Sequence, residues 1–196
     1  MRVRFMLHSL LTAALLLLLT ACQPQNATSF IGTDLTGTQF GKPLSLTDHT
    51  GKLRNMADFK GKVVVLFFGY THCPDVCPTT MSDLKQTMKL LGSKADDVQV
   101  LFVTVDPERD TQTVLAQFVP SFDPRFIGLR GTEAEVAANM AEYKVYAAKV
   151  SEPGKTGYSM DHSAGIYVFD KSGAPRIYLS YGQKPAEIAH DLQQLL

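Results

Sequence analysis

A run of apolar residues, Val63 to Phe68, leads directly into a loop that carries two cysteines, Cys73 and Cys77. A short, unbroken apolar run bounded by turn residues predicts a strand that is buried on both faces of a sheet. Open α/β folds place ligands and chemistry at the carboxyl ends of such strands. We therefore expect an α/β fold with two thiols at the functional edge of its sheet.

The spacing of these two cysteines leaves several roles open. A Cys-x-x-Cys loop would indicate thioredoxin-like redox chemistry, but here three residues intervene. The wider loop can direct two sulfurs toward one soft metal ion, form a disulfide, or alternate between those states. A purely structural disulfide and two buried, inert thiols are the remaining alternatives.

The amino-terminal residues have the order of a signal peptide, which is basic, then apolar, then small. Arg2 and Arg4 form the basic start, and Leu10 to Leu19 is nearly continuously apolar. The tetrapeptide that ends at Cys22 resembles the bacterial lipoprotein cleavage box, in which this cysteine becomes lipidated. An uncleaved membrane anchor is the alternative, although the run is short for a span, which needs about 20 apolar residues.

These features divide the chain into a signal peptide (1–21), a lipid-anchored tether (22–38) and one domain (39–196). We expect the domain on the extracytoplasmic, periplasmic side of a membrane in the cell envelope, where conditions are oxidising. With one of the three cysteines lipidated, Cys73 and Cys77 have no competing thiol. The chain holds 19 basic and 19 acidic residues, so nothing predicts a nucleic-acid partner.

Strands and helices are expected to alternate along the domain. The predicted strands are 43–47, 52–56, 62–68, 98–105, 126–129, 143–150, 164–170 and 175–181. The predicted helices are 78–91, 111–118, one that a capping box opens at Thr132, and 185–196. A β-hairpin followed by βαβ and ββα is the thioredoxin-like plan with an added amino-terminal hairpin, a central mixed sheet flanked by helices.

This plan brings distant residues together. Strands 62–68 and 98–105 are expected to be parallel, so their carboxyl ends share one edge. The strand that starts near residue 164 runs antiparallel to them, so its beginning, just after His162, lies at the same edge. Four side chains should therefore converge there: Cys73, Cys77, Asp106 and His162.

Two thiolates and one imidazole form a soft ligand set that favours Cu(I) and can also hold Cu(II) or zinc. Pro78 opens the following helix, and the partial positive charge of the helix start is expected to favour the Cys77 thiolate. Asp161 is expected either to orient the His162 imidazole or to be an exposed loop acid. Asp106 is expected either to contribute to the metal site or to be a helix-capping or turn residue.

Three segments of the chain resemble the signature segments of the Sco/SenC family. They are Gly69-Tyr70-Thr71-His72-Cys73-Pro74-Asp75-Val76-Cys77-Pro78, Val105-Asp106-Pro107-Glu108-Arg109-Asp110 and Asp161-His162-Ser163. The resemblance covers roughly residues 30–196. It implies a thioredoxin-like fold, copper held by Cys73, Cys77 and His162, and a role in assembling the binuclear copper centre of cytochrome c oxidase. Asp106 matches a family acid that influences the site or a partner contact.

Two function classes follow. The first is a copper metallochaperone whose partners are cytochrome c oxidase subunit II or another copper protein, with a copper donor or thiol reductant upstream. The second is a thiol–disulfide oxidoreductase that uses Cys73 and Cys77; sensing of copper or redox state is a weaker third. Thioredoxins place a cis-proline beside the dithiol, and here His162 occupies that place, which favours the metal function.

Overall fold

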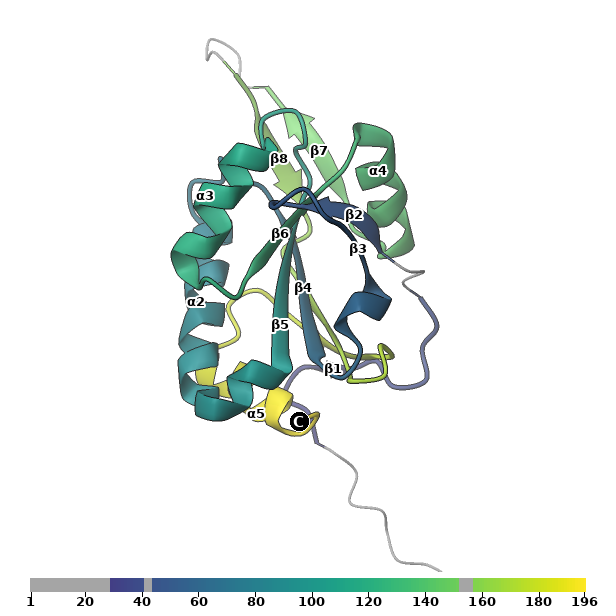
Figure 1. Cartoon of the computed structure of the whole chain (residues 1–196), viewed down its shortest axis with the longest axis vertical. Helices are drawn as coiled ribbons and strands as arrows, with labels where there is room; N and C mark the ends of the chain where they lie inside the picture. The colour runs from purple at the N-terminus through teal and green to yellow at the C-terminus, as the bar shows by residue number, and fades with distance from the viewer. Residues whose placement is uncertain (1–28, 41–43, 152–156) are drawn as a thin grey trace, which may run out of the picture.

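The computed structural model describes residues 29–40, 44–151 and 157–196. An eight-stranded sheet lies at the centre, with helices on both faces and a separate two-stranded sheet at one end (Figure 1). The strands are β1 (Thr33–Asp34), β2 (Ser45–Asp48), β3 (Leu53–Asn55), β4 (Val63–Gly69), β5 (Val98–Thr104), β6 (Ile127–Arg130), β7 (Ala147–Val150), β8 (Ser159–His162), β9 (Ile166–Phe169) and β10 (Pro175–Leu179). The helices are η2 (Met56–Phe59), α2 (Val76–Leu91), η3 (Gly92–Asp97), α3 (Gln112–Phe122), α4 (Glu133–Glu142) and α5 (Pro185–Gln193).

The main sheet is mixed, and its strand order is β1-β10-β9-β4-β5-β6-β2-β3. Strands β4, β5 and β6 are parallel, so their carboxyl ends lie at one edge. Strand β9 runs antiparallel to β4, and Ile166 at its start pairs with Phe67 near the end of β4. The hairpin β2–β3 joins the sheet beside β6. The predicted thioredoxin-like mixed sheet with an added amino-terminal hairpin is therefore confirmed.

The two central strands form the middle of the core. Every residue of β4 and β5 is buried, because α2 and α3 cover one face of the sheet and α4 lies on the other side (Figure 1). Helix α5 packs against α2 near the end of the molecule at which the chain terminates. The uniformly apolar sequences of β4 and β5 follow from this burial on both faces.

Described residues before 39, the predicted start of the domain, pack against it. Thr33 and Asp34 form β1, which pairs with β10. The buried carboxylate of Asp191 in α5 accepts hydrogen bonds from the amides of Ile31 (2.8 Å) and Gly32 (2.8 Å). The last part of the predicted tether (22–38) is thus packed against the domain.

Other predictions on the amino-terminal part of the chain lie outside the described residues. These are the signal peptide (1–21), lipidation at Cys22 and residues 22–28 of the tether. Among the helices of the described ranges, none combines the length and apolarity that a membrane crossing needs.

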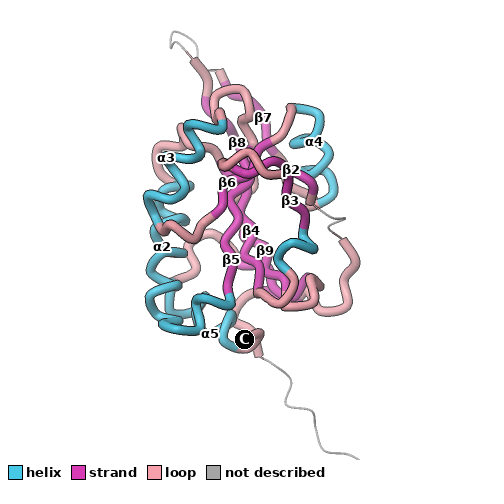
Figure 2. Tube along the Cα trace, viewed as in Figure 1, coloured by secondary structure: helices cyan, strands magenta, loops and turns pink. Residues whose placement is uncertain are grey.

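The second sheet is an arm formed by β7 and β8, drawn at the top of Figure 1 and in magenta in Figure 2. Extended structure was predicted over residues 143–150, but the β8 strand was not predicted. In the antiparallel arm, Ala147 of β7 pairs with His162, which is the last residue of β8. The arm is therefore the element that carries the predicted histidine ligand.

Candidate metal site

The thiol loop starts where β4 ends, at Gly69. A Cβ atom on Gly69 would lie 3.0 Å from the Cys77 sulfur and 2.9 Å from ring atoms of Phe67 and Phe102. Real Cβ contacts are essentially never that short to rigid neighbours. The absence of a side chain at Gly69 therefore makes room for the Cys77 sulfur against the end of β4.

The two cysteines come from a loop and from the helix that follows it. Helix α2 begins at Val76, two residues before its predicted start, so Cys77 lies in its first turn. The amide of Cys77 donates a hydrogen bond to the Cys73 sulfur over 3.3 Å. Both cysteines are free thiols; Cys77 is fully buried and Cys73 is half-buried. An amide at a helix start thus points at one of the two sulfurs.

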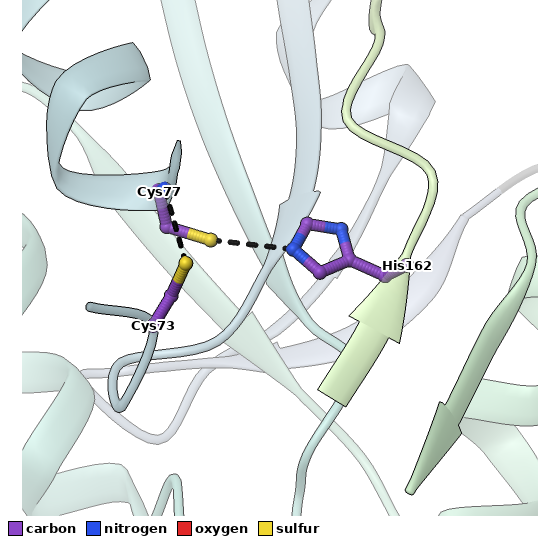
Figure 3. Close-up of side chains that lie close together, drawn as sticks. All are labelled: Cys73, Cys77 and His162. Carbon is purple, nitrogen blue, oxygen red and sulfur yellow. Dashed lines mark hydrogen bonds between the residues drawn. The ribbon is translucent and has the colours of Figure 1, made fainter. Parts of the chain in front are cut away.

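The imidazole of His162 faces these sulfurs from the arm. Figure 3 shows the ring reaching from the end of β8 toward Cys77, and the Nε2 atom lies 3.4 Å from the Cys77 sulfur. The three ligand atoms of Cys73, Cys77 and His162 all lie within 4.8 Å of one another. The predicted convergence of these three side chains is confirmed, and they lie close enough to bind one metal ion.

A hydrogen bond fixes which nitrogen of His162 is available. The Nδ1 atom lies 2.9 Å from the carbonyl oxygen of Ser163. A carbonyl only accepts, so Nδ1 carries a proton, and in the neutral ring Nε2 keeps its lone pair. The rings of Tyr70 and Phe67 contact the imidazole edge-on at centroid distances of 5.7 and 6.4 Å. The available nitrogen therefore already points at the sulfurs, as metal ligation requires.

The protonation of Cys77 differs from expectation. Burial raises the pKa of the Cys77 thiol well above its ordinary value, and the charges of Cys73 and Asp110 raise it further. The prediction that the helix start favours the Cys77 thiolate is therefore wrong in its net direction, because desolvation of the buried sulfur dominates. A cation between the sulfurs would reverse this balance, since metal ligation deprotonates a thiol.

Asp106 lies beneath the surface and outside the three-ligand group. Its side chain is fully buried, and its carboxylate accepts hydrogen bonds from Arg109 Nε (2.5 Å) and from the Tyr158 hydroxyl (2.8 Å). The Arg109 bond lies within the turn after β5, where the Asp110 amide also donates to the Asp106 carbonyl oxygen over 2.9 Å, and the Tyr158 bond joins that turn to the residue before β8.

Asp161 precedes His162 on β8, and its side chain is exposed. Neighbouring residues of a strand point to opposite sides, and His162 faces the sulfurs. The Nδ1 atom that a carboxylate would hold is bonded to Ser163 instead. The alternative of an exposed acid therefore describes Asp161 better than the alternative of an imidazole-orienting acid.

Asp110 supports the thiol loop, a role that the sequence did not indicate. Its fully buried carboxylate accepts hydrogen bonds from the Thr71 amide (3.0 Å), the Thr71 hydroxyl (2.6 Å) and the Thr104 hydroxyl (2.6 Å). Thr71 lies two residues before Cys73, so Asp110 fixes the start of the loop. The sequence signal that could have pointed to Asp110 is its position in the second segment that resembles the Sco/SenC family, residues 105–110.

Comparisons with known proteins agree with this geometry. The SCO1/SenC family model matches residues 32–196. The mitochondrial "Protein SCO2 homolog" of Bos taurus is 38% identical over 152 residues, covering 76% of this chain and 57% of the bovine protein, so the match spans less than two thirds of that relative. The "SCO2-like protein" of Rickettsia felis is 32% identical, covering 79% of this chain and 76% of its own length.

Solved structures give the same result. The structure of Bradyrhizobium japonicum ScoI with copper bound is 42% identical and superposes with a TM-score of 0.74, covering 81% of this chain and all of the other. The solution structure of apo Sco1 from Thermus thermophilus is 36% identical with a TM-score of 0.77, covering 87% of this chain and 99% of the other.

Proposed function

The chain belongs to the SCO1/SenC family, and from that premise we propose that it is a copper metallochaperone. It binds copper through Cys73, Cys77 and His162 and assists assembly of the binuclear copper centre of cytochrome c oxidase. The observation that carries the proposal is the placement of the three ligand atoms within 4.8 Å of one another by a loop, a helix and the arm. The copper in the similar Bradyrhizobium japonicum structure supports it.

The donor set suits a transferable ion. Two thiolates and an imidazole are soft enough for Cu(I) and can also hold Cu(II). Cys77 is buried, whereas Cys73 and His162 are only half-buried, so the site is accessible on their side. A partner's thiol or imidazole can approach there and replace the ligands one at a time. The family resemblance implies cytochrome c oxidase subunit II as the recipient.

A second candidate function is reduction of a partner's disulfide. The observation in its favour is the asymmetry of the thiols: a half-buried Cys73 can attack, and a buried Cys77 can then resolve the mixed disulfide. In that case the partner's copper-ligand cysteines are the substrate, and an external thiol reductant restores the pair. A Cys73–Cys77 disulfide would supply no thiolate ligand, so copper binding requires the reduced pair.

The two functions separate at His162. His162→Ala removes a copper ligand and leaves both thiols, so a metallochaperone should lose copper retention and oxidase assembly together. A reductase should keep most of its activity, because its attacking group is a thiolate. His190→Ala, at an exposed position on α5, is the matched control. Cells carrying only His162→Ala should fail to assemble the oxidase at low copper; normal assembly there would refute the metallochaperone.

Membrane attachment is part of the proposal. We propose that Cys22 is lipidated after removal of residues 1–21 and that the domain lies on the periplasmic side of a membrane in the cell envelope. In support, Ile31 and Gly32 in the last part of the tether contact Asp191 in α5, at the end of the molecule opposite β8 (Figure 1). A lipid on Cys22 would hold the metal site away from the bilayer. Mass spectrometry of the wild-type chain and of Cys22→Ser tests the lipid directly.

A further inference from the structure

The β7–β8 arm supplies one of the three ligands, yet it is separate from the main sheet. Within the described residues, neither strand of the arm joins the ladder of the eight-stranded sheet. Cys73 and Cys77, in contrast, follow directly from β4, at the centre of that sheet. The distance between His162 and the sulfurs therefore depends on whatever fixes the arm to the body of the domain.

Partly buried polar contacts join the arm to the turn after β5. The residue before β8 is Tyr158, whose hydroxyl donates to the Asp106 carboxylate over 2.8 Å. Arg109 Nε donates to the other oxygen of Asp106 over 2.5 Å, and Arg109 Nη1 donates to the Tyr158 carbonyl oxygen over 2.7 Å. The Arg109 guanidinium also lies 3.7 Å from the centre of the Tyr158 ring. Three side chains thus join the turn after β5 to the start of β8 in a closed ring of contacts.

A second, weaker link runs beside the first. Lys149 of β7 pairs with Glu108 over 2.5 Å, and its ammonium lies 4.9 Å from the centre of the Tyr158 ring. Both charged side chains are about half exposed, and exposed ion pairs contribute little because water and salt screen them. The Asp106 carboxylate is fully buried and Arg109 is 23% exposed, so the first link is the stronger of the two.

We propose that Asp106, Arg109 and Tyr158 form a clamp that positions His162 against the two sulfurs and so sets how long copper is retained. The proposal rests on the proposed function, in which His162 is a copper ligand. The clamp itself touches no ligand atom of the metal site. It acts through β8, which extends about 13 Å from Tyr158 to His162 at about 3.3 Å per residue.

Arg109 also reaches the site by a second, shorter route. Its guanidinium lies 5.8 Å from the centre of the Tyr70 ring. That ring meets the His162 imidazole edge-on at 5.7 Å. Loss of the guanidinium would therefore loosen the start of β8 and one wall of the imidazole pocket together. Loss of the Tyr158 hydroxyl would loosen only the start of β8.

The test measures the rate at which Cu(I) passes from the reduced full-length chain to excess bathocuproine disulfonate. Arg109→Met should accelerate the loss of copper about 10- to 100-fold, the range expected when groups that orient a metal ligand are removed. Tyr158→Phe keeps the ring and loses one hydrogen bond, so it should accelerate it about 2- to 10-fold. Arg125→Met is the matched control, because it breaks a similar ion pair, with Asp123 at 2.7 Å, outside the clamp; its rate should stay within about twofold of wild type.

The same variants in a His162→Ala background show whether the clamp acts through the histidine. If it does, Arg109→Met should add nothing to the faster copper loss that His162→Ala causes. In the copper-free protein, hydrogen exchange of the amides of 159–162 should speed up in Arg109→Met and not in Arg125→Met. Should Arg109→Met fail to fold, Tyr158→Phe gives the same comparisons.

Two results would overturn the clamp and leave the proposed function intact. They are equal copper-loss rates for Arg109→Met and Arg125→Met, and a full effect of Arg109→Met in the His162→Ala background. If His162→Ala itself leaves the rate unchanged, then the histidine is not a ligand, and both the clamp and the proposed copper site are wrong.

Discussion

Replacing Asp110 with alanine should destabilise the domain through the thiol loop. The change removes the fully buried acceptor of three hydrogen bonds from two threonines, Thr71 and Thr104. The Thr71 hydroxyl can turn to His72 Nδ1, which lies 3.1 Å away. The Thr71 amide and the Thr104 hydroxyl have lost their acceptor. An unsatisfied buried donor costs about 1–3 kcal/mol, so two of them reduce the free energy of unfolding by about 4 kcal/mol.

Urea and thermal denaturation of the reduced, metal-free chain measure this loss. For a domain of this size, about 4 kcal/mol corresponds to a fall in Tm of about 8–16 °C. The reaction of Cys73 with a disulfide reagent should also be faster, because Thr71 no longer holds the loop. An unchanged urea midpoint would refute the reasoning.

Three other perturbations have directions that the structure fixes. Gly69→Ala should cost about 1–3 kcal/mol in urea denaturation and displace the Cys77 sulfur, because the new Cβ would lie 3.0 Å from it; unchanged stability would contradict the packing. Lys144 has a φ of 54° after α4, so Lys144→Gly should stabilise the domain by about 1 kcal/mol, whereas Lys144→Ala should not. Burial raises the pKa of Asp48, but hydrogen bonds from Thr50, Arg54 and Lys52 outweigh it and lower the pKa to about 2. The pKa of an unfolded aspartate is about 3.9, so the difference adds about 2.6 kcal/mol to the free energy of unfolding. This contribution is present above about pH 4 and is lost as pH falls toward 2. Asp48→Asn should abolish this part of the pH dependence of the unfolding free energy.

The sequence by itself determined the elements whose cause is local. The apolar runs of β4 and β5 predict strands buried on both faces, because a strand exposed on one face would alternate polar residues. The capping box at Thr132 predicts the start of α4, and Thr132 and Glu135 do cap it in both directions. From the parallel order of the strands it followed that Cys73, Cys77 and His162 share one edge.

Only the tertiary structure decided the strand that carries His162 and the partners of the acids around the site. The Tyr158–Asp106 bond joins residues 52 positions apart, and the Thr71–Asp110 bond joins residues 39 apart. The local pattern of apolar and polar residues does not indicate such pairs, because each pair depends on how two separate elements pack together.

The pKa of Cys77 also separates what the local sequence determines from what the tertiary packing determines. The sequence places this residue at a helix start, where the dipole lowers a thiol pKa. Packing against Gly69 and the surrounding rings removes water from the sulfur, and the pKa rises instead. Proximity of the ligands follows from strand order, whereas their protonation and orientation depend on solvent exclusion and hydrogen bonds that only the packed chain creates.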